Sequence, residues 1–201
     1  TLIDISPSDS LKRIKRFLYR LKVKEDFSCD NKTSLTWDNF IKRGTENQAK
    51  KQGGRHDSPA AIVYTGGTTG DPKGAVLTND CINLPSKQYG LADIPRGEND
   101  RFLNIMPPFI AYGLINGIHM PLSLGMELVL IPKFDPDEFS QIMKTYKPAH
   151  FVGIPMHFEK LMYDKRCEGM DLSYILNAGC GGDAVPDSLE IEFNKFLKEH
   201  N

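Results

Sequence analysis

Short apolar runs alternate with longer amphipathic stretches from residue 59 to residue 201, and this alternation restricts the possible folds more than any other feature. An apolar, β-branched run predicts a buried strand, and apolar residues spaced three or four apart predict a helix. Strands and helices that alternate in this way build a layered α/β fold with a largely parallel sheet and helices on its faces. We expect strands at residues 60–64, 75–78, 101–106, 127–131, 150–153 and 174–178, and helices at residues 78–92, 111–124, 135–146, 155–164 and 186–200.

The first 57 residues differ in character, so we divide the chain into an upstream segment, residues 1–57, and a core sub-domain, residues 58–201. Apolar spacing predicts an amphipathic helix over residues 11–21, whose other face is basic. A solvated surface is the ordinary interpretation of such a face, and a patch for phosphate or a membrane surface is the alternative. The rest of the segment is polar, with a short element at residues 34–40 and an exposed loop at 50–57.

Composition excludes several classes of protein. With 25 basic and 26 acidic residues the net charge is −1, so no bulk field attracts nucleic acid or an anionic membrane. No apolar run is long enough for a spanning helix, and no secretory signal is visible. The four cysteines have no paired spacing and the histidines no metal spacing, which argues against disulfides and a metal site. We therefore expect a cytoplasmic protein.

The segment 64–74, YTGGTTGDPKG, carries the clearest chemical signal. Its glycines let backbone N–H groups converge on one point, its threonines add hydroxyl donors, and its lysine adds a compact positive charge. This combination predicts a cradle for a polyphosphate. The Walker loop and the dinucleotide fingerprint both fail on spacing, because Gly74 follows Lys73 and Thr65 stands where the fingerprint needs its first glycine.

The same segment resembles the phosphate loop of the adenylate-forming, or AMP-binding, enzymes, most closely the fatty acyl-CoA ligase branch. The resemblance runs from about residue 59 to the C-terminal residue. It implies that the chain is part of the large N-terminal domain of an acyl-CoA synthetase-like fold. It also implies ATP phosphate binding by the loop, with Lys73 and Thr69 as catalytic residues. The phosphate-binding set is Thr65, Gly66, Gly67, Thr68, Thr69, Gly70 and Lys73.

Two further segments resemble family motifs. Residues 106–113 resemble the segment whose helix lines the pocket for the carboxylate substrate, and they place Phe109, Tyr112 and Gly113 there. Ile110 stands where a histidine is common, which favours a more apolar pocket; an ordinary buried helix is the alternative. Residues 178–186 resemble the glycine turn that supports the adenine and the acyl chain. They assign that role to Gly181, Gly182 and Asp183, with a plain strand-to-helix turn as the alternative.

The resemblance implies an ATP-dependent ligase that activates a fatty acid as an acyl-adenylate and passes the acyl group to coenzyme A, with Mg²⁺ accompanying ATP. Alternatives are a nucleotide-binding module without catalysis and an amino-acid adenylation domain of a peptide synthetase. Later family motifs are absent, so we expect the 201 residues to be a fragment that is inactive alone. A sheet that stops early exposes an edge, so we also expect self-association.

Overall fold

The computed structural model describes residues 2–23, 34–46, 53–65, 71–97, 99–131 and 133–201. The chain forms two compact units, Thr1–Gly53 and Gly54–Asn201. The functional division predicted between residues 57 and 58 stays a prediction.

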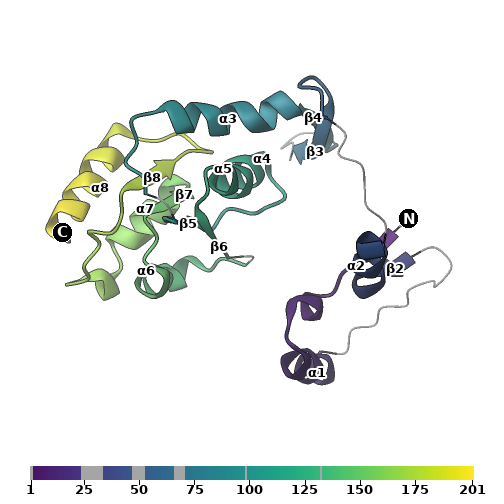
Figure 1. Cartoon of the computed structure of the whole chain (residues 1–201). Helices are drawn as coiled ribbons and strands as arrows, with labels where there is room; N and C mark the ends of the chain where they lie inside the picture. Colours follow the sequence, from purple (N-terminus) through teal and green to yellow (C-terminus); the bar gives the residue numbers. More distant parts are fainter. Residues whose placement is uncertain (1, 24–33, 47–52, 66–70, 98, 132) are drawn as a thin grey trace. The chain divides into compact units, whose positions relative to one another are not determined.

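The smaller unit contains two short parallel strands and two α-helices (Figure 1). Its elements are β1 (Leu2–Asp4), the 3-10 turn η1 (Pro7–Ser10), α1 (Arg13–Lys22), β2 (Ser34–Thr36) and α2 (Trp37–Glu46). The predicted basic helix is present as α1. The short element expected at residues 34–40 is β2 followed by a helix that continues to Glu46. Trp37, Phe40 and Ile41 lie on one face of that helix. Neither α1 nor α2 contains a buried residue.

The second unit begins with a hairpin of two antiparallel strands, β3 (Pro59–Thr65) and β4 (Lys73–Thr78). Both strands were predicted, but the expectation that the first is buried was wrong. Val63 is buried, whereas Ile62 is 62% exposed and Tyr64 is 68% exposed. In the described part of the chain the hairpin has no further strand beside it, and α3 is the helix that contacts both of its strands. An apolar run alone does not distinguish these two situations.

The main sheet has four strands in the order β6-β5-β7-β8, and every pairing in it is parallel. The strands are β5 (Arg101–Asn104), β6 (Glu127–Leu130), β7 (His150–Gly153) and β8 (Asn177–Cys180). The expected parallel α/β sheet is therefore confirmed. The last strand starts three residues later than predicted, because the N–H of Ile175 bonds to the carbonyl of Leu172 in a turn instead of joining the ladder.

Helices connect the strands at the expected places (Figure 1). They are α3 (Asn79–Leu91), α4 (Ala111–Leu114), α5 (Met120–Ser123), α6 (Phe139–Tyr146), α7 (Pro155–Met162) and α8 (Asp187–Glu199). Short turns η3 (Pro136–Glu138) and η4 (Lys165–Cys167) precede α6 and follow α7. The helix predicted at residues 111–124 contains a π-helical turn, η2 (Ile115–His119), between α4 and α5. Thr78 caps α3 by accepting the N–H of Cys81.

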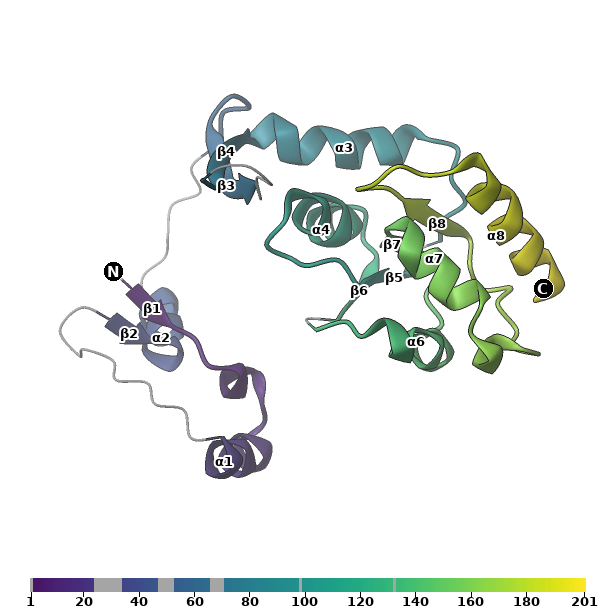
Figure 2. The ribbon, with the colours of Figure 1, turned by 180° about the vertical axis from the view of Figure 1, so that it is seen from behind.

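Helices cover both faces of the sheet, as Figure 2 also shows. Leu103 and Phe151 contribute to the cluster formed with α6, α7 and α8. Their neighbours Phe102 and Val152 contribute to a second cluster, which includes Met120 of α5 and side chains from α3 and α4. Successive strand residues point to opposite faces, so each central strand supplies both clusters. The result is a three-layer arrangement.

None of the helices that the structure describes combines the length and apolar character needed to cross a bilayer. Cys81, Cys167 and Cys180 are free thiols.

Candidate functional site

The carboxyl ends of β5, β7 and β8 form the candidate site. In open parallel sheets, ligands bind where the strands end and the chain turns into the next helix. Here β7 ends at Gly153, β8 ends at Cys180, and the N–H of Gly181 donates to the carbonyl of Gly153 at 3.1 Å. This bond ties the glycine turn after β8 to the neighbouring strand.

Tyr112 of α4 closes one side of this edge. Its hydroxyl lies 3.4 Å from the carbonyl oxygens of Gly153 and Gly179, one on each strand, and donates to them. Burial raises the pKa of Tyr112 to about 12, so the hydroxyl stays protonated and remains a donor at neutral pH. The two hydrogen bonds therefore hold the ring in place against the strand ends.

The glycine turn offers exposed backbone beside that ring. Gly182 has φ of +82°, which favours glycine, and a side-chain carbon added there would lie 3.7 Å from the Tyr112 ring. A carbon added at Gly181 would meet the Tyr112 hydroxyl at 3.6 Å. Asp183 is exposed, and its Oδ1 accepts the N–H of Ala184 at 2.7 Å. A flat ligand can approach this turn because no side chain projects from either glycine.

Cys180 precedes the turn and is partly buried. Burial raises the pKa of its thiol, which keeps the sulfur protonated. The thiol is therefore less readily ionised than that of an exposed cysteine.

The segment that follows β5 and leads through α4 into η2 is tightly packed. A side-chain carbon added to Gly113 would meet the carbonyl oxygen of Pro107 at 2.1 Å, and one added to Gly117 would meet the amide of Asn104 at 2.4 Å. Asn104 is fully buried; its Nδ2 donates to the carbonyl of Gly113 and its Oδ1 accepts the N–H of Met106. This packing fixes α4, and with it Tyr112, against the sheet.

The predicted pocket residues do not all lie in that packed region. Gly113 is buried and Tyr112 belongs to the second apolar cluster, but Phe109 is 76% exposed. Their shared assignment to an acyl pocket stays a prediction.

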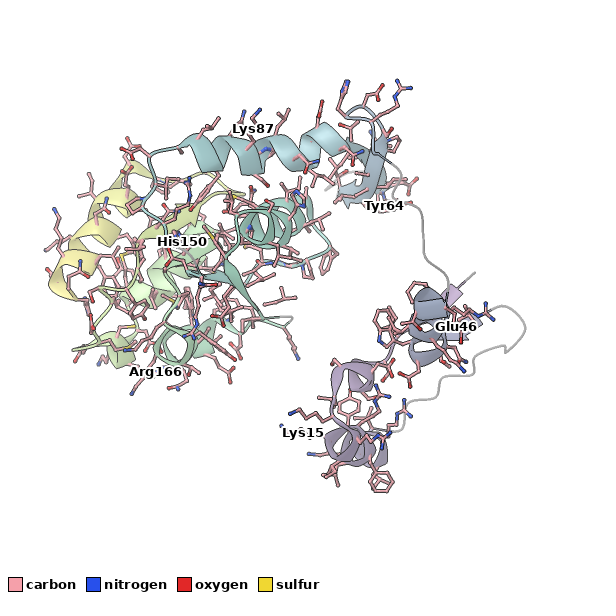
Figure 3. The ribbon with its side chains drawn as sticks, viewed as in Figure 1. Lys15, Glu46, Tyr64, Lys87, His150 and Arg166 are labelled. Atoms are coloured by element: carbon pink, nitrogen blue, oxygen red, sulfur yellow. The ribbon has the colours of Figure 1, made fainter. Side chains whose placement is uncertain are left out.

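The predicted phosphate loop joins the two strands of the hairpin. Thr65 and Lys73 pair across the last rung of the ladder, and the Thr65 hydroxyl donates to the carbonyl of Lys73 at 3.3 Å. The Lys73 side chain is exposed, and so is Tyr64, which is labelled in Figure 3. Gly66, Gly67, Thr68, Thr69 and Gly70 lie outside the described residues. The hairpin contacts α3, which anchors it in the second unit.

Sequence analysis missed a buried polar chain at the opposite ends of the strands. His150 is fully buried and is labelled in Figure 3. Its Nε2 lies 3.1 Å from Asp100, its Nδ1 lies 3.4 Å from the Tyr89 hydroxyl, and Asn177 donates to that hydroxyl at 2.9 Å. The sequence does not distinguish His150 from the other histidines, because its partners come from distant segments.

The structure contains pockets of about 440 and 450 Å³. The first lies between β8 and α8, and its lining includes Cys180 and Val185 from the segment of the glycine turn. The second lies beside α7, near Lys160 and Arg166. Neither pocket is lined by Tyr112, Gly181 or Gly182, so the candidate site remains the backbone edge at the strand ends. In the described ranges no three His, Cys, Asp or Glu side chains come together to hold a metal ion.

The arrangement can hold a flat group on the glycine backbone, beside a protonated phenol and next to an apolar cluster. Among its described residues we find no nucleophile paired with a base.

Comparisons with known proteins agree with this picture. The profile of the family described as AMP-binding enzyme matches residues 5–200. A long-chain-fatty-acid–CoA ligase of Bacillus subtilis (strain 168) is 36% identical over 138 residues, which are 68% of this chain and 24% of the relative. An indoleacetate–CoA ligase of Aromatoleum aromaticum is 32% identical over 139 residues, 69% of this chain and 27% of the relative. The chain thus spans about a quarter of the length of these relatives.

The fold is also similar to a solved structure. The N-terminal domain of FACL13 from Mycobacterium tuberculosis, crystallised with an inhibitor, matches with a TM-score of 0.65 and 20% identity. The match covers 81% of this chain and 41% of that one. It confirms the expected fold, a part of such an N-terminal domain.

Proposed function

The chain belongs to the AMP-binding enzyme family, and from that premise we propose that it is part of an ATP-dependent acid–CoA ligase. The observation that carries this proposal is the segment 64–74, which matches the family's phosphate loop and is held at its base by the Thr65–Lys73 pair. The two relatives reported above are both named as acid–CoA ligases. In the reaction, a carboxylate oxygen attacks the α-phosphorus of ATP and pyrophosphate leaves. The coenzyme A thiol then attacks the acyl carbonyl and displaces AMP.

The phosphate loop is proposed to bind the β- and γ-phosphates. Thr65, Thr68 and Thr69 offer hydroxyl donors, and the Gly66–Gly67 and Gly70 amides offer backbone donors. Lys73 neutralises charge that builds on the leaving pyrophosphate, which lowers the barrier without any covalent chemistry. This role fits an exposed ammonium at the first position of β4.

The strand-end site is proposed to bind adenine and the acyl group. Gly181 and Gly182 would support the flat base, with Asp183 at the rim, and Tyr112 and Gly113 would border the acyl group together with Phe109. Tyr112 suits this role because it is fixed by two carbonyls and protonated at neutral pH.

Mg²⁺ is proposed to arrive on the phosphates of ATP. The described residues hold no acidic cluster that fits the ion, so no side chain is assigned to it and no step is derived through it.

A fatty acid is the substrate class we propose. The relative from Bacillus subtilis, 36% identical to this chain, is named as a long-chain-fatty-acid–CoA ligase, which supports this class. Indoleacetate, which the second relative's name gives as its substrate, is the main alternative acid class to include in a test. We place this activity in the cytoplasm.

The experiment is carboxylate-dependent exchange of pyrophosphate into ATP by the full-length protein that carries this chain. Fatty, aromatic, dicarboxylic and amino acids form the panel. Exchange stimulated by fatty acids supports the proposal in full, and exchange with amino acids instead points to a peptide-synthetase-type domain. ATP binding without exchange for any acid identifies a non-catalytic nucleotide-binding module and rejects the ligase.

Self-association of the 201-residue chain is proposed through β8. This strand pairs with β7 on one side, and in the described sheet it has no partner on the other. An open edge of this kind accepts another strand. Sedimentation that shows only monomer at high concentration contradicts this proposal.

A further inference from the structure

Helix α1 carries an apolar stripe that no described element of its own unit covers. Ile14, Phe17, Leu18 and Leu21 follow the spacing i, i+3, i+4, i+7, and they are 77%, 63%, 59% and 67% exposed. A helix of a globular protein normally buries such a stripe against its core. Contiguous exposed apolar surface on a regular helix marks an interaction site.

The helix is held to its unit by charged side chains and not by this stripe. Arg16 Nε donates to the carbonyl of Ser8 at 3.0 Å, and Arg16 Nη1 pairs with Asp38 at 3.1 Å. Arg20 Nη2 lies 3.5 Å from Asp9, and its Nε donates to the Ser8 hydroxyl at 3.2 Å. Ser8 is fully buried beneath these contacts. The polar side of α1 therefore faces its own unit, which leaves the apolar stripe turned outward.

Further cations border the stripe. With 3.6 residues per turn, Lys15 and Lys22 lie about a quarter turn to one side of it and Arg13 about a quarter turn to the other. All three are exposed, and no ion pair joins them to another described residue. Lys15 is labelled on α1 in Figure 3. The segment from Lys12 to Lys22 contains six basic residues and no acidic one.

We propose that α1 docks on an anionic lipid bilayer and lies in the plane of its surface. An apolar stripe flanked by lysine and arginine is the composition that inserts into the boundary between headgroups and acyl chains. The long stems of the flanking lysines let their ammonium groups reach the lipid phosphates while the stripe is immersed. This interaction goes beyond the proposed ligase activity and uses none of the residues assigned to it.

Charge decides between a lipid surface and a second copy of this chain. Two copies that pack stripe to stripe bring the flanking cations of both helices together without an acidic partner on either helix. Like charges placed close together oppose association. A negatively charged lipid surface attracts the same cations. It is therefore the partner that suits both the apolar stripe and the basic residues beside it.

The test is flotation of the 201-residue chain with two kinds of vesicle, phosphatidylcholine alone and phosphatidylcholine with phosphatidylserine. We expect binding that requires phosphatidylserine and weakens as salt rises. The double variant Phe17→Ser/Leu18→Ser should bind the anionic vesicles at least roughly tenfold more weakly than the unchanged chain. The matched control is Ile191→Ser, which removes a 70% exposed side chain from α8 and should leave binding unchanged.

A second pair of variants tests the charges. Lys15→Glu/Lys22→Glu should remove the preference for phosphatidylserine, whereas Lys198→Glu, an exposed lysine in the last turn of α8, should not. All these positions are exposed, so circular dichroism and urea unfolding should match the unchanged chain. A site-specific readout is Phe17→Trp in a Trp37→Phe background, whose emission should shift to the blue on the anionic vesicles only.

Three results overturn the proposal. One is equal binding by Phe17→Ser/Leu18→Ser and the unchanged chain. Another is a dimer that forms without vesicles and dissociates in that variant, which assigns the stripe to a second copy. The third is a full-length protein that no longer floats with anionic vesicles, which means that another part of the protein covers the stripe.

Discussion

The hydroxyl of Tyr112 lies 3.4 Å from the carbonyl oxygen of Gly179, which joins α4 to the last residues of β8. The same hydroxyl reaches the carbonyl of Gly153 on β7 at an equal distance. One side chain therefore links a helix to the ends of two strands. The position of the glycine turn depends on this link, because Gly181 follows β8 directly and bonds back to Gly153.

Tyr112→Phe should therefore loosen the site while the fold persists. Two long hydrogen bonds are lost and the ring is kept, so we expect about 1 kcal/mol less stability at neutral pH. The pH dependence should change as well. The raised pKa of about 12 means that the unfolded chain loses the proton near pH 10 while the folded chain keeps it. The resulting stabilisation is present below pH 10 and is lost as pH rises towards 12.

Urea unfolding near pH 9 and near pH 12 measures this effect. The difference between the unchanged chain and Tyr112→Phe should shrink at the higher pH. A constant difference across this window contradicts the assigned donor role. The control is Tyr146→Phe, at a side chain that is 38% exposed and whose hydroxyl bonds to none of the described residues.

Gly113→Ala should reduce stability strongly, whereas Gly181→Ala should leave it almost unchanged. The new carbon at Gly113 meets backbone at 2.1 Å, and backbone cannot move aside as a flexible side chain does, so we expect a loss of roughly 3 kcal/mol or more. The new carbon at Gly181 meets the Tyr112 hydroxyl at an ordinary 3.6 Å, so stability should change by less than about 0.5 kcal/mol.

Activity separates the two glycines further. Gly181→Ala places a methyl group where adenine is proposed to rest, so the full-length protein should show a raised KM for ATP at nearly unchanged stability. A KM equal to that of the unchanged protein argues against the adenine assignment.

Lys73→Ala should reduce the rate of pyrophosphate exchange by about a hundredfold or more, because a charge that stabilises the leaving group is removed. The side chain is exposed, so the urea midpoint should stay the same. Lys87→Ala, at an exposed position on α3, is the matched control and should keep full activity. Unchanged turnover in Lys73→Ala removes this residue from the mechanism.

His157 should make the fold less stable in acid. Burial lowers the pKa of His157, and its Nδ1 accepts the N–H of Ile154 at 3.3 Å, which requires the neutral ring. The unfolded chain takes up this proton more readily, so the stabilisation is present above pH 6.5 and is lost as pH falls below it.

His157→Asn keeps an acceptor near the same place but cannot titrate. Its stability should therefore fall less between pH 7 and about pH 5 than that of the unchanged chain. The control is His56→Asn, at a side chain that is 80% exposed, which should retain the full acid dependence. Equal slopes for His157→Asn and the unchanged chain would rule out His157 as the source.

The buried chain from Asn177 through Tyr89 to His150 should behave as one unit. Tyr89→Phe leaves the Nδ1 of His150 and the amide of Asn177 without their partner, at a cost of about 1 to 3 kcal/mol. Asn177→Ala combined with Tyr89→Phe should cost less than the sum of the single variants, since both remove the same bond. A double-mutant cycle by urea unfolding measures the coupling, and strict additivity contradicts it.

The sequence by itself determined the order and class of the elements. The period of the apolar residues is a local property, and it located β7 at residues 150–153 and the five helical stretches of the second unit. The segment 64–74 likewise identified the family without any coordinates, because its chemistry is contained in eleven consecutive residues.

Only the tertiary structure decided which surfaces are covered. The run at residues 60–64 reads as a buried strand, yet β3 stands in a two-stranded hairpin and exposes Ile62 and Tyr64. The stripe of α1 reads as a helix face that packs inward, yet Arg16 and Arg20 hold the opposite side to the unit. Tyr112, Gly153 and Gly179 come together from three distant segments. Burial, and contacts between distant segments, depend on how separate elements pack. Local sequence periodicity carries no information about that packing.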